Sequence, residues 1–125
     1  MTTAALLLSL LALVLTKVAD FVTTVRHVGH EGEVNPFARR CFECMGFKGG
    51  LWVVALLWLA IVAITFGYAW LKGDPSTRWL TALAGFAIAW AQWDAARFNR
   101  MGRSSWFTRK ALWFYGRWAR FWKSR

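Results

Sequence analysis

Three long apolar runs are the feature of this 125-residue chain that most constrains its fold. They cover residues 4–28, 51–71 and 79–99; the second carries no charged residue, and the third carries none before Asp94. Each run is close to the length of about 20 residues that crosses a bilayer as a helix. A water-soluble domain this small has too little volume to bury a composition that is 58% hydrophobic. Since open backbone cannot face lipid, the sequence predicts an all-α membrane protein with three transmembrane helices.

Basic residues outnumber acidic residues by 16 to 6, and they gather on one side of the predicted membrane. The end of the first run and the connection after it contain four Lys and Arg residues, and the segment from Arg97 onward contains nine. The turn between the second and third runs contains only Lys72 and Arg78. Because Lys and Arg favour the cytoplasmic side, we expect an external N-terminus and a cytoplasmic C-terminus in a prokaryotic inner membrane.

The chain divides into a predicted transmembrane domain, residues 1–100, and a basic aromatic tail, residues 101–125. The first run is not expected to be a cleaved signal peptide, because no positive charge precedes it and it contains no A-x-A cleavage site. Small residues recur four apart in the third run, as in Gly85 and Ala89 or Ala87 and Ala91. This spacing lets helix backbones approach closely in lipid, and the partner is either the first helix or another copy of the chain.

The tail is predicted to form an amphipathic helix that lies in the headgroup plane. One face of that helix carries apolar side chains, those of Phe107, Ala111, Phe114, Trp118, Phe121 and Trp122. The opposite face carries the cations Arg109, Arg117, Arg120 and Lys123. These charges favour the anionic lipids of the cytoplasmic leaflet. Nucleic-acid binding is the less favoured alternative because the aromatic residues form one continuous stripe, and a tail that only sets topology is the other.

A polar stripe follows one face of the first helix near its cytoplasmic end. It begins at Asp20 and continues through Thr23, Thr24 and His27. Asp94 lies toward the same end of the third run, close to Gln92. Ionisable groups are costly inside a membrane and therefore mark candidate functional sites. Lys17 lies three residues before Asp20, so a simple ion pair between them is the structural alternative.

Two pairs of residues have spacings that are typical of metal ligands. His27 and His30 form H-x-x-H, and Cys41 and Cys44 form C-x-x-C, so together they offer the ligand types that zinc prefers. A second candidate set combines carboxylates with the histidines: Asp20, His27, Glu33 and His30. In the alternative without a metal, the cysteines belong to a short helix.

That short helix is expected to begin at Asn35 as N-cap and Pro36 at the first helical position. Its predicted apolar face consists of Phe37, Cys41, Cys44 and Met45. Cysteines on such a face act as small hydrophobic residues.

The chain resembles a family of small prokaryotic three-span membrane proteins of unknown function with a D-x-x-T … E-x-N-P signature. The matching residues are Asp20 and Thr23, Gly29, the run Glu33-x-Asn35-Pro36, and Asn99. The resemblance implies that Asp20, Thr23, Glu33, Asn35 and Asn99 converge on one polar site. It covers about residues 10–100 and implies no activity, and the histidines, the C-x-x-C and the tail are not part of it.

These observations favour a membrane-embedded protein that binds or helps to transport a cation, a proton or a lipid headgroup. The expected ligand-binding residues are Asp20, Thr23 and Glu33, supported by Asn35, Asp94 and Asn99. Three helices enclose little space, so a homo-oligomer or a larger membrane complex is expected. One alternative is a pore-forming protein similar to class I phage holins. The other is a membrane-embedded enzyme that acts on a lipid or peptide, with Glu33 or Asp20 as general base and a possible divalent metal such as zinc.

Overall fold

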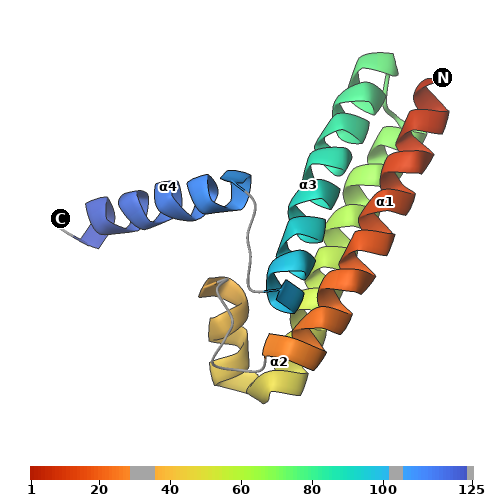
Figure 1. Cartoon of the computed structure of the whole chain (residues 1–125). Coiled ribbons are helices and arrows are strands. Elements are labelled where there is room, and N and C mark those ends of the chain that lie inside the picture. The colour runs from red at the N-terminus through yellow and green to blue at the C-terminus, as the bar shows by residue number, and fades with distance from the viewer. Residues whose placement is uncertain (29–35, 102–105, 124–125) are drawn as a thin grey trace.

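The computed structural model describes residues 1–28, 36–101 and 106–123, and in these ranges the backbone is almost entirely helical without a strand. The elements are α1 (Thr2–Thr23), the π-helical turn η1 (Thr24–Val28), α2 (Pro36–Leu71), α3 (Pro75–Met101) and α4 (Trp106–Lys123). The first helix, the long second part of α2 and α3 lie side by side as a bundle, from which α4 points away (Figure 1). The all-α prediction is confirmed.

Two helical segments, Thr2–His27 and Phe37–Leu71, are long and apolar enough to cross a membrane. The α3 helix is not one of them, because Gln92, Asp94 and several tryptophans interrupt its apolar residues. Its 27 residues nevertheless extend for about 40 Å at the rise of an α-helix. The third span therefore stays a prediction, although α3 is long enough to form one.

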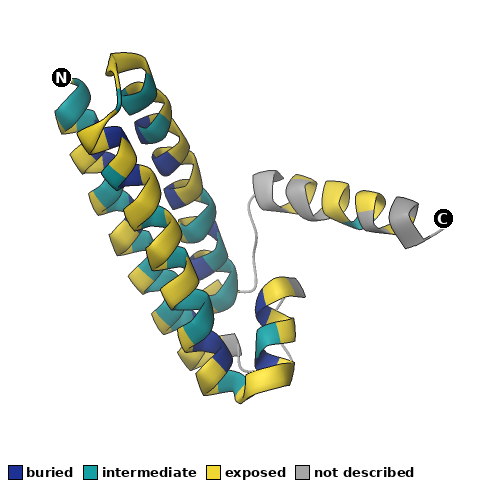
Figure 2. Ribbon diagram, turned by 180° about the vertical axis from the view of Figure 1, so that it is seen from behind, coloured by how far each residue is buried: buried dark blue, intermediate teal, exposed yellow. Residues whose placement is uncertain are grey.

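The outer surface of the bundle is covered with large apolar side chains. Ile64 on α2 is 72% exposed, and Leu8 on α1 and Leu80 on α3 are exposed as well. Figure 2 shows exposed positions along the outer sides of all three helices, whereas buried positions lie between them. Water-soluble monomers rarely expose continuous apolar patches of this extent, whereas lipid-facing helices do.

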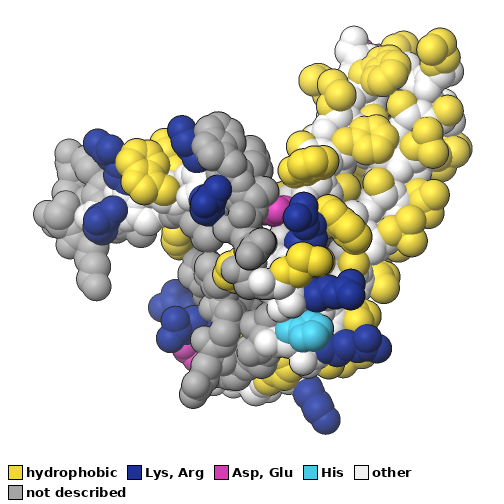
Figure 3. Space-filling view, in the orientation of Figure 1, with side chains coloured by type: hydrophobic (Ala, Val, Ile, Leu, Met, Phe, Trp, Pro, Cys, Tyr) yellow, Lys and Arg dark blue, Asp and Glu magenta, His cyan; other side chains and the backbone are white. Residues whose placement is uncertain are grey.

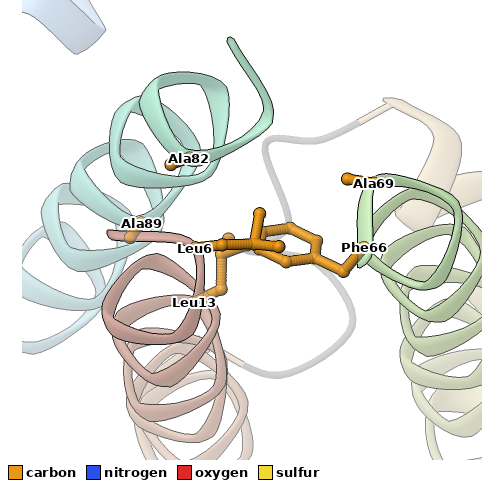
Figure 4. Packing of buried hydrophobic residues seen from close by; sticks show 6 residues of the cluster. All are labelled: Leu6, Leu13, Phe66, Ala69, Ala82 and Ala89. Atoms are coloured by element: carbon orange, nitrogen blue, oxygen red, sulfur yellow. The ribbon is translucent and has the colours of Figure 1, made fainter. Parts of the chain in front are cut away.

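The α1 and α3 helices run in the same direction and form the closest contact in the bundle. We call this contact the α1–α3 seam; its residues on α3 are spaced alternately three and four apart, namely Ala82, Gly85, Ala89, Gln92, Ala96 and Asn99. Leu6 and Leu13 of α1 pack here against Ala82 and Ala89, and Phe66 of α2 reaches into the same cluster (Figure 4).

Gly85 allows the helices of the seam to approach closely. A Cβ atom at this position would collide with Ser9 Oγ and lie 2.9 Å from Phe66 Cζ. The Ser9 hydroxyl donates a hydrogen bond of 2.8 Å to the carbonyl oxygen of Ala82. Of the two possible partners for the Gly85 and Ala89 face, the structure therefore selects the first helix of the same chain.

The α2 helix is bent sharply at Gly46, where φ is 78° and ψ is 164°. Only glycine adopts such a conformation readily. The bend folds the short first part of α2 back toward the start of the long part (Figure 1). Gly50 permits the contact, because a Cβ atom there would lie 2.5 Å from Phe42 Cδ1 and 2.7 Å from the backbone carbon of Cys41.

The predicted apolar face of the short helix is not the face that packs against the bundle. Phe37, Cys44 and Met45 are exposed, whereas Ala38 and Phe42 are buried. These two residues form a second small core with Leu51, against which Phe21 of α1 and Phe47 pack. The bend at Gly46 determines this outcome, because it turns the other face of the short helix toward the bundle.

The turn between α2 and α3 is capped from both sides. Asp74 is the N-cap of α3, since its Oδ1 accepts a hydrogen bond of 2.9 Å from the backbone N–H of Thr77. The Arg78 guanidinium donates to the carbonyl oxygens of Ala69 and Trp70, each at 3.2 Å, and so satisfies the end of α2. With Pro75 at its first position, α3 begins four residues before the predicted start of the span at residue 79.

Candidate functional site

The α1–α3 seam becomes polar halfway along its length, at Gln92 of α3. The amide orientation assigned from its neighbours has the Gln92 nitrogen donating to Thr16 Oγ1 at 2.9 Å and to the Leu13 carbonyl oxygen at 3.2 Å. Its oxygen accepts a hydrogen bond of 2.7 Å from Trp58 Nε1 of α2. One side chain therefore joins all three helices of the bundle by hydrogen bonds, a role that was not predicted for Thr16, Trp58 or Gln92.

Lys17, the residue after Thr16, forms an ion pair with Asp20, which lies one turn farther along α1. The Lys17 Nζ lies 3.3 Å from Asp20 Oδ2, and the two side chains are 19% and 21% exposed. Lys17 Nζ also lies 5.8 Å from the centroid of the Trp58 ring, within the range of a cation–π contact. Asp20 is thus neutralised by its own helix, as the structural alternative predicted.

Asn99 connects the end of α3 to the end of the first helix. Its Nδ2 donates hydrogen bonds to Thr24 Oγ1 at 3.1 Å and to Thr23 Oγ1 at 3.5 Å. Thr24 is buried, and it begins the π-helical turn η1. The structure therefore brings together Thr23 and Asn99, two residues of the predicted polar site. Asp94, two turns above the end of α3, is 4% exposed.

Three of the predicted site residues lie outside the residues that the structure describes: His30, Glu33 and Asn35. Their place in a polar or metal site stays a prediction. His27 is exposed on η1, Cys41 is half-buried and Cys44 is exposed, and neither cysteine forms a disulfide. In the described part of the chain, no three His, Cys, Asp or Glu side chains come close enough together to hold a metal.

Cations surround the end of the bundle at which this polar half of the seam lies. The exposed basic side chains there are Arg26 on η1, Arg39, Arg40 and Lys48 on α2, and Arg97 and Arg100 on α3. On the face shown in Figure 3, Lys and Arg side chains gather at the lower end of the bundle and on α4, whereas the upper part is almost entirely hydrophobic or uncharged. We call these six Lys and Arg side chains the basic rim. One of them, Arg39, is paired with Glu43 at an Nε–Oε1 distance of 3.3 Å.

The sequence contains a signal for the contact between Thr16 and Gln92, namely the spacing of residues along the seam. Thr16 follows Ser9 by seven residues and Gln92 follows Gly85 by seven, so each lies on the same helix face as a close-packed position. Trp58 has no comparable signal, because its place depends on how α2 is set against the seam.

The comparisons with known proteins identify no relative. No protein-family model matches the chain, and no curated protein and no solved structure matches it significantly.

Proposed function

We propose that this protein is a small integral protein of a prokaryotic inner membrane that binds anionic lipid headgroups at its cytoplasmic end. The observation that carries the proposal is the basic rim around the polar half of the α1–α3 seam. The concentration of Lys and Arg at that end supports a cytoplasmic orientation for it and an external N-terminus.

A lipid headgroup fits the site better than a cation or a proton does. The basic rim repels cations, and the Asp20 carboxylate already has a cationic partner in Lys17. Guanidinium groups bind phosphate in a planar, two-pronged geometry, and several of them stand at the level where the ends of α1 and α3 meet the headgroups. Among the ligands expected from the sequence, we therefore choose the headgroup.

Three transmembrane helices remain the topology that we propose. The α3 helix packs along α1 in the same direction, so an α1 helix that crosses the bilayer brings α3 with it. The inward side of α3 carries the small and polar residues of the seam, and these lower its mean hydropathy together with the exposed tryptophans Trp79, Trp90 and Trp93.

We propose that the protein acts as a homo-oligomer or as a subunit of a larger membrane complex. The Gly85 and Ala89 face is covered by α1, so a contact with another chain must use a different face. The holin-like pore and the membrane-embedded enzyme remain alternatives without an observation that favours either.

Lipid retention in native mass spectrometry tests the headgroup proposal. The full chain, purified in a mild non-ionic detergent, is mixed with phosphatidylglycerol or with phosphatidylcholine. We expect phosphatidylglycerol to be retained preferentially, and Arg97→Gln combined with Arg100→Gln to reduce that preference. Lys72→Gln is the matched control, because it removes a cation from the opposite end of the bundle. Equal retention of both lipids, or an unchanged preference in the double variant, would overturn the proposal.

Metal content, measured on the same sample without chelators, tests the zinc site separately. About one zinc per chain, lost in His27→Ala or Glu33→Ala, would support the predicted metal ligands. A well-folded protein without metal would leave the headgroup site and remove the zinc site.

A further inference from the structure

The α4 helix stands apart from the rest of the molecule and is the most strongly amphipathic of the four α-helices. Among the described elements it contacts only α3, and that contact is brief. Figures 1 and 2 show it pointing away from the bundle in both views. Its position in the fold is therefore not explained by packing within the chain.

The two sides of α4 differ in chemistry. On one side Phe114 is 68% exposed, and Tyr115 and Trp118 flank it as further exposed aromatic side chains. The other side carries Arg109, Arg117 and Arg120, all exposed, with Lys110 near the boundary. Trp113 is the aromatic residue on the cationic side, and the Arg117 guanidinium lies 5.3 Å from the centroid of its ring.

The connection to α3 limits where α4 can go. Five backbone steps separate Met101, the last residue of α3, from Trp106, the first residue of α4. A fully extended chain of that length covers at most about 18 Å. If α3 ends at the membrane surface, α4 begins within that distance of the headgroups and experiences a high local concentration of them.

We infer that α4 lies flat on the anionic leaflet next to the bundle, with Phe114, Tyr115 and Trp118 at the boundary between headgroups and acyl chains. The inference rests on the cytoplasmic orientation in the proposed function, although not on the headgroup site at the basic rim. Burial of the aromatic face removes apolar surface from water. The cations on the other side face lipid phosphates, and long Lys and Arg side chains near the boundary extend their charges toward water.

Charge and geometry favour a lipid surface over a nucleic acid. Proteins that bind single-stranded nucleic acids combine cations and stacking aromatic residues along one groove. On α4 the exposed aromatic residues and the cations lie mostly on opposite sides, so one flat ligand cannot meet both sets. A bilayer surface meets both at once, because it offers phosphates above and acyl chains below.

Spin labels on the two sides of α4 test the inference in the full chain with Cys41→Ser and Cys44→Ser. One label is attached through Phe114→Cys on the aromatic side. The second is attached through Gly116→Cys, where a Cβ meets nothing within 4 Å. In vesicles of equal parts phosphatidylcholine and phosphatidylglycerol, we expect the first label to be accessible to oxygen. The second label is expected to be accessible to a water-soluble nickel chelate instead.

Removal of charge sharpens the test. Each basic residue near an anionic surface strengthens binding by about fivefold, so Arg109→Gln combined with Arg120→Gln is expected to lower the docked-to-free ratio about 25-fold. Lys72→Gln is the control. Docking is also expected to be weaker on vesicles of phosphatidylcholine alone than on vesicles that contain phosphatidylglycerol.

Three outcomes would overturn the inference. They are equal accessibility of the two labels in anionic vesicles, no effect of the charge-removing pair, and shielding of the Phe114 position only when RNA is added. If one of these outcomes is found but phosphatidylglycerol is still retained preferentially, the inference about α4 fails and the headgroup site at the basic rim stands. If α4 docks but the protein shows no preference for phosphatidylglycerol, the headgroup proposal fails and the inference about α4 stands.

Discussion

The α1–α3 seam has two halves that share one spacing and differ in chemistry. In the half near the N-terminus, Leu6 and Leu13 pack against alanines, and Gly85 lets the backbones approach. In the half near the basic rim, Gln92 and Asn99 occupy the equivalent positions and form hydrogen bonds across the seam. Lipid gives apolar helices little reason to associate, so close packing and interhelical hydrogen bonds must hold them together. The half near the N-terminus relies mainly on close packing, with one hydrogen bond from Ser9 to the Ala82 carbonyl oxygen, and the other half relies mainly on hydrogen bonds between side chains.

Filling the close-packed half of the seam is expected to destabilise the protein most. Gly85→Leu places a side chain where Ser9 and Phe66 leave no room. We expect it to lower the free energy of unfolding by about 3 kcal/mol, at the upper end of the cost of overpacking. Ala87→Leu is the matched control, since Ala87 is exposed on the same helix. Denaturation in mild detergent, followed by circular dichroism, measures both; equal stabilities would contradict the close-packed seam.

The ion pair of the polar half is expected to have the next largest effect. Lys17→Met leaves the Asp20 carboxylate without its cation inside an apolar helix. We expect a loss of about 2 kcal/mol, less than for a fully buried pair because both side chains are partly exposed. Addition of Asp20→Asn is expected to recover most of that loss. A double-mutant cycle on the same denaturation signal measures the coupling, and additive losses would show that the pair does not interact.

A hydroxyl group offers a smaller and cleaner test of the hydrogen bonds between helices. Thr16 and Thr65 each bond to a carbonyl oxygen of their own helix, but only Thr16 also contacts Gln92 on another helix. Thr16→Val is therefore expected to cost about 1 kcal/mol more than Thr65→Val. If the two valine variants have the same free energy of unfolding, the contact between Thr16 and Gln92 does not stabilise the polar half.

The smallest expected effect is a pH dependence outside the seam, at the turn between α2 and α3. The hydrogen bonds from Thr77 lower the pKa of the exposed Asp74 carboxyl below its ordinary value of 3.8. A lowered pKa in the folded state means that the cap stabilises the protein fully above that ordinary value and is lost as the pH falls through the lowered pKa. The difference in melting temperature between the native protein and Asp74→Ala should shrink over that acid range. The difference in melting temperature between Asp74→Asn and Asp74→Ala should stay constant over the same range, because asparagine caps without titrating.

The long helices were predictable, because the length and apolarity of a run directly determine whether it forms one. The run at residues 51–71 ends at Leu71, as α2 does. The bend at Gly46 was not predictable, since Gly49 and Gly50 lie nearby and nothing in the local sequence indicates which of the three has a positive φ. Because of this bend, Ala38 and Phe42 face the bundle, whereas Phe37, Cys44 and Met45 of the predicted apolar face are exposed.

The candidate site was predictable in part. Asp20, Thr23 and Asp94 were recognised because polar groups are rare in apolar runs, whereas Thr16 and Gln92 were not selected, and the structure places Asn99 in contact with Thr23. The bond between Gln92 and Trp58 depends on how two helices are set against each other, which the spacing within either helix does not contain. The roles of His30, Glu33 and Asn35 stay predictions.

The parallel pairing of α1 with α3 imposes an order of assembly on the growing chain. The Ser9 hydroxyl cannot donate its hydrogen bond to the Ala82 carbonyl oxygen until 73 more residues have been synthesised. At roughly 5–20 residues per second, that delay is about 4–15 s. The contacts that cap the turn between α2 and α3 join residues at most nine apart and are complete once Arg78 is made. A chain released before Ala82 therefore contains a first helix whose partner has not yet been made.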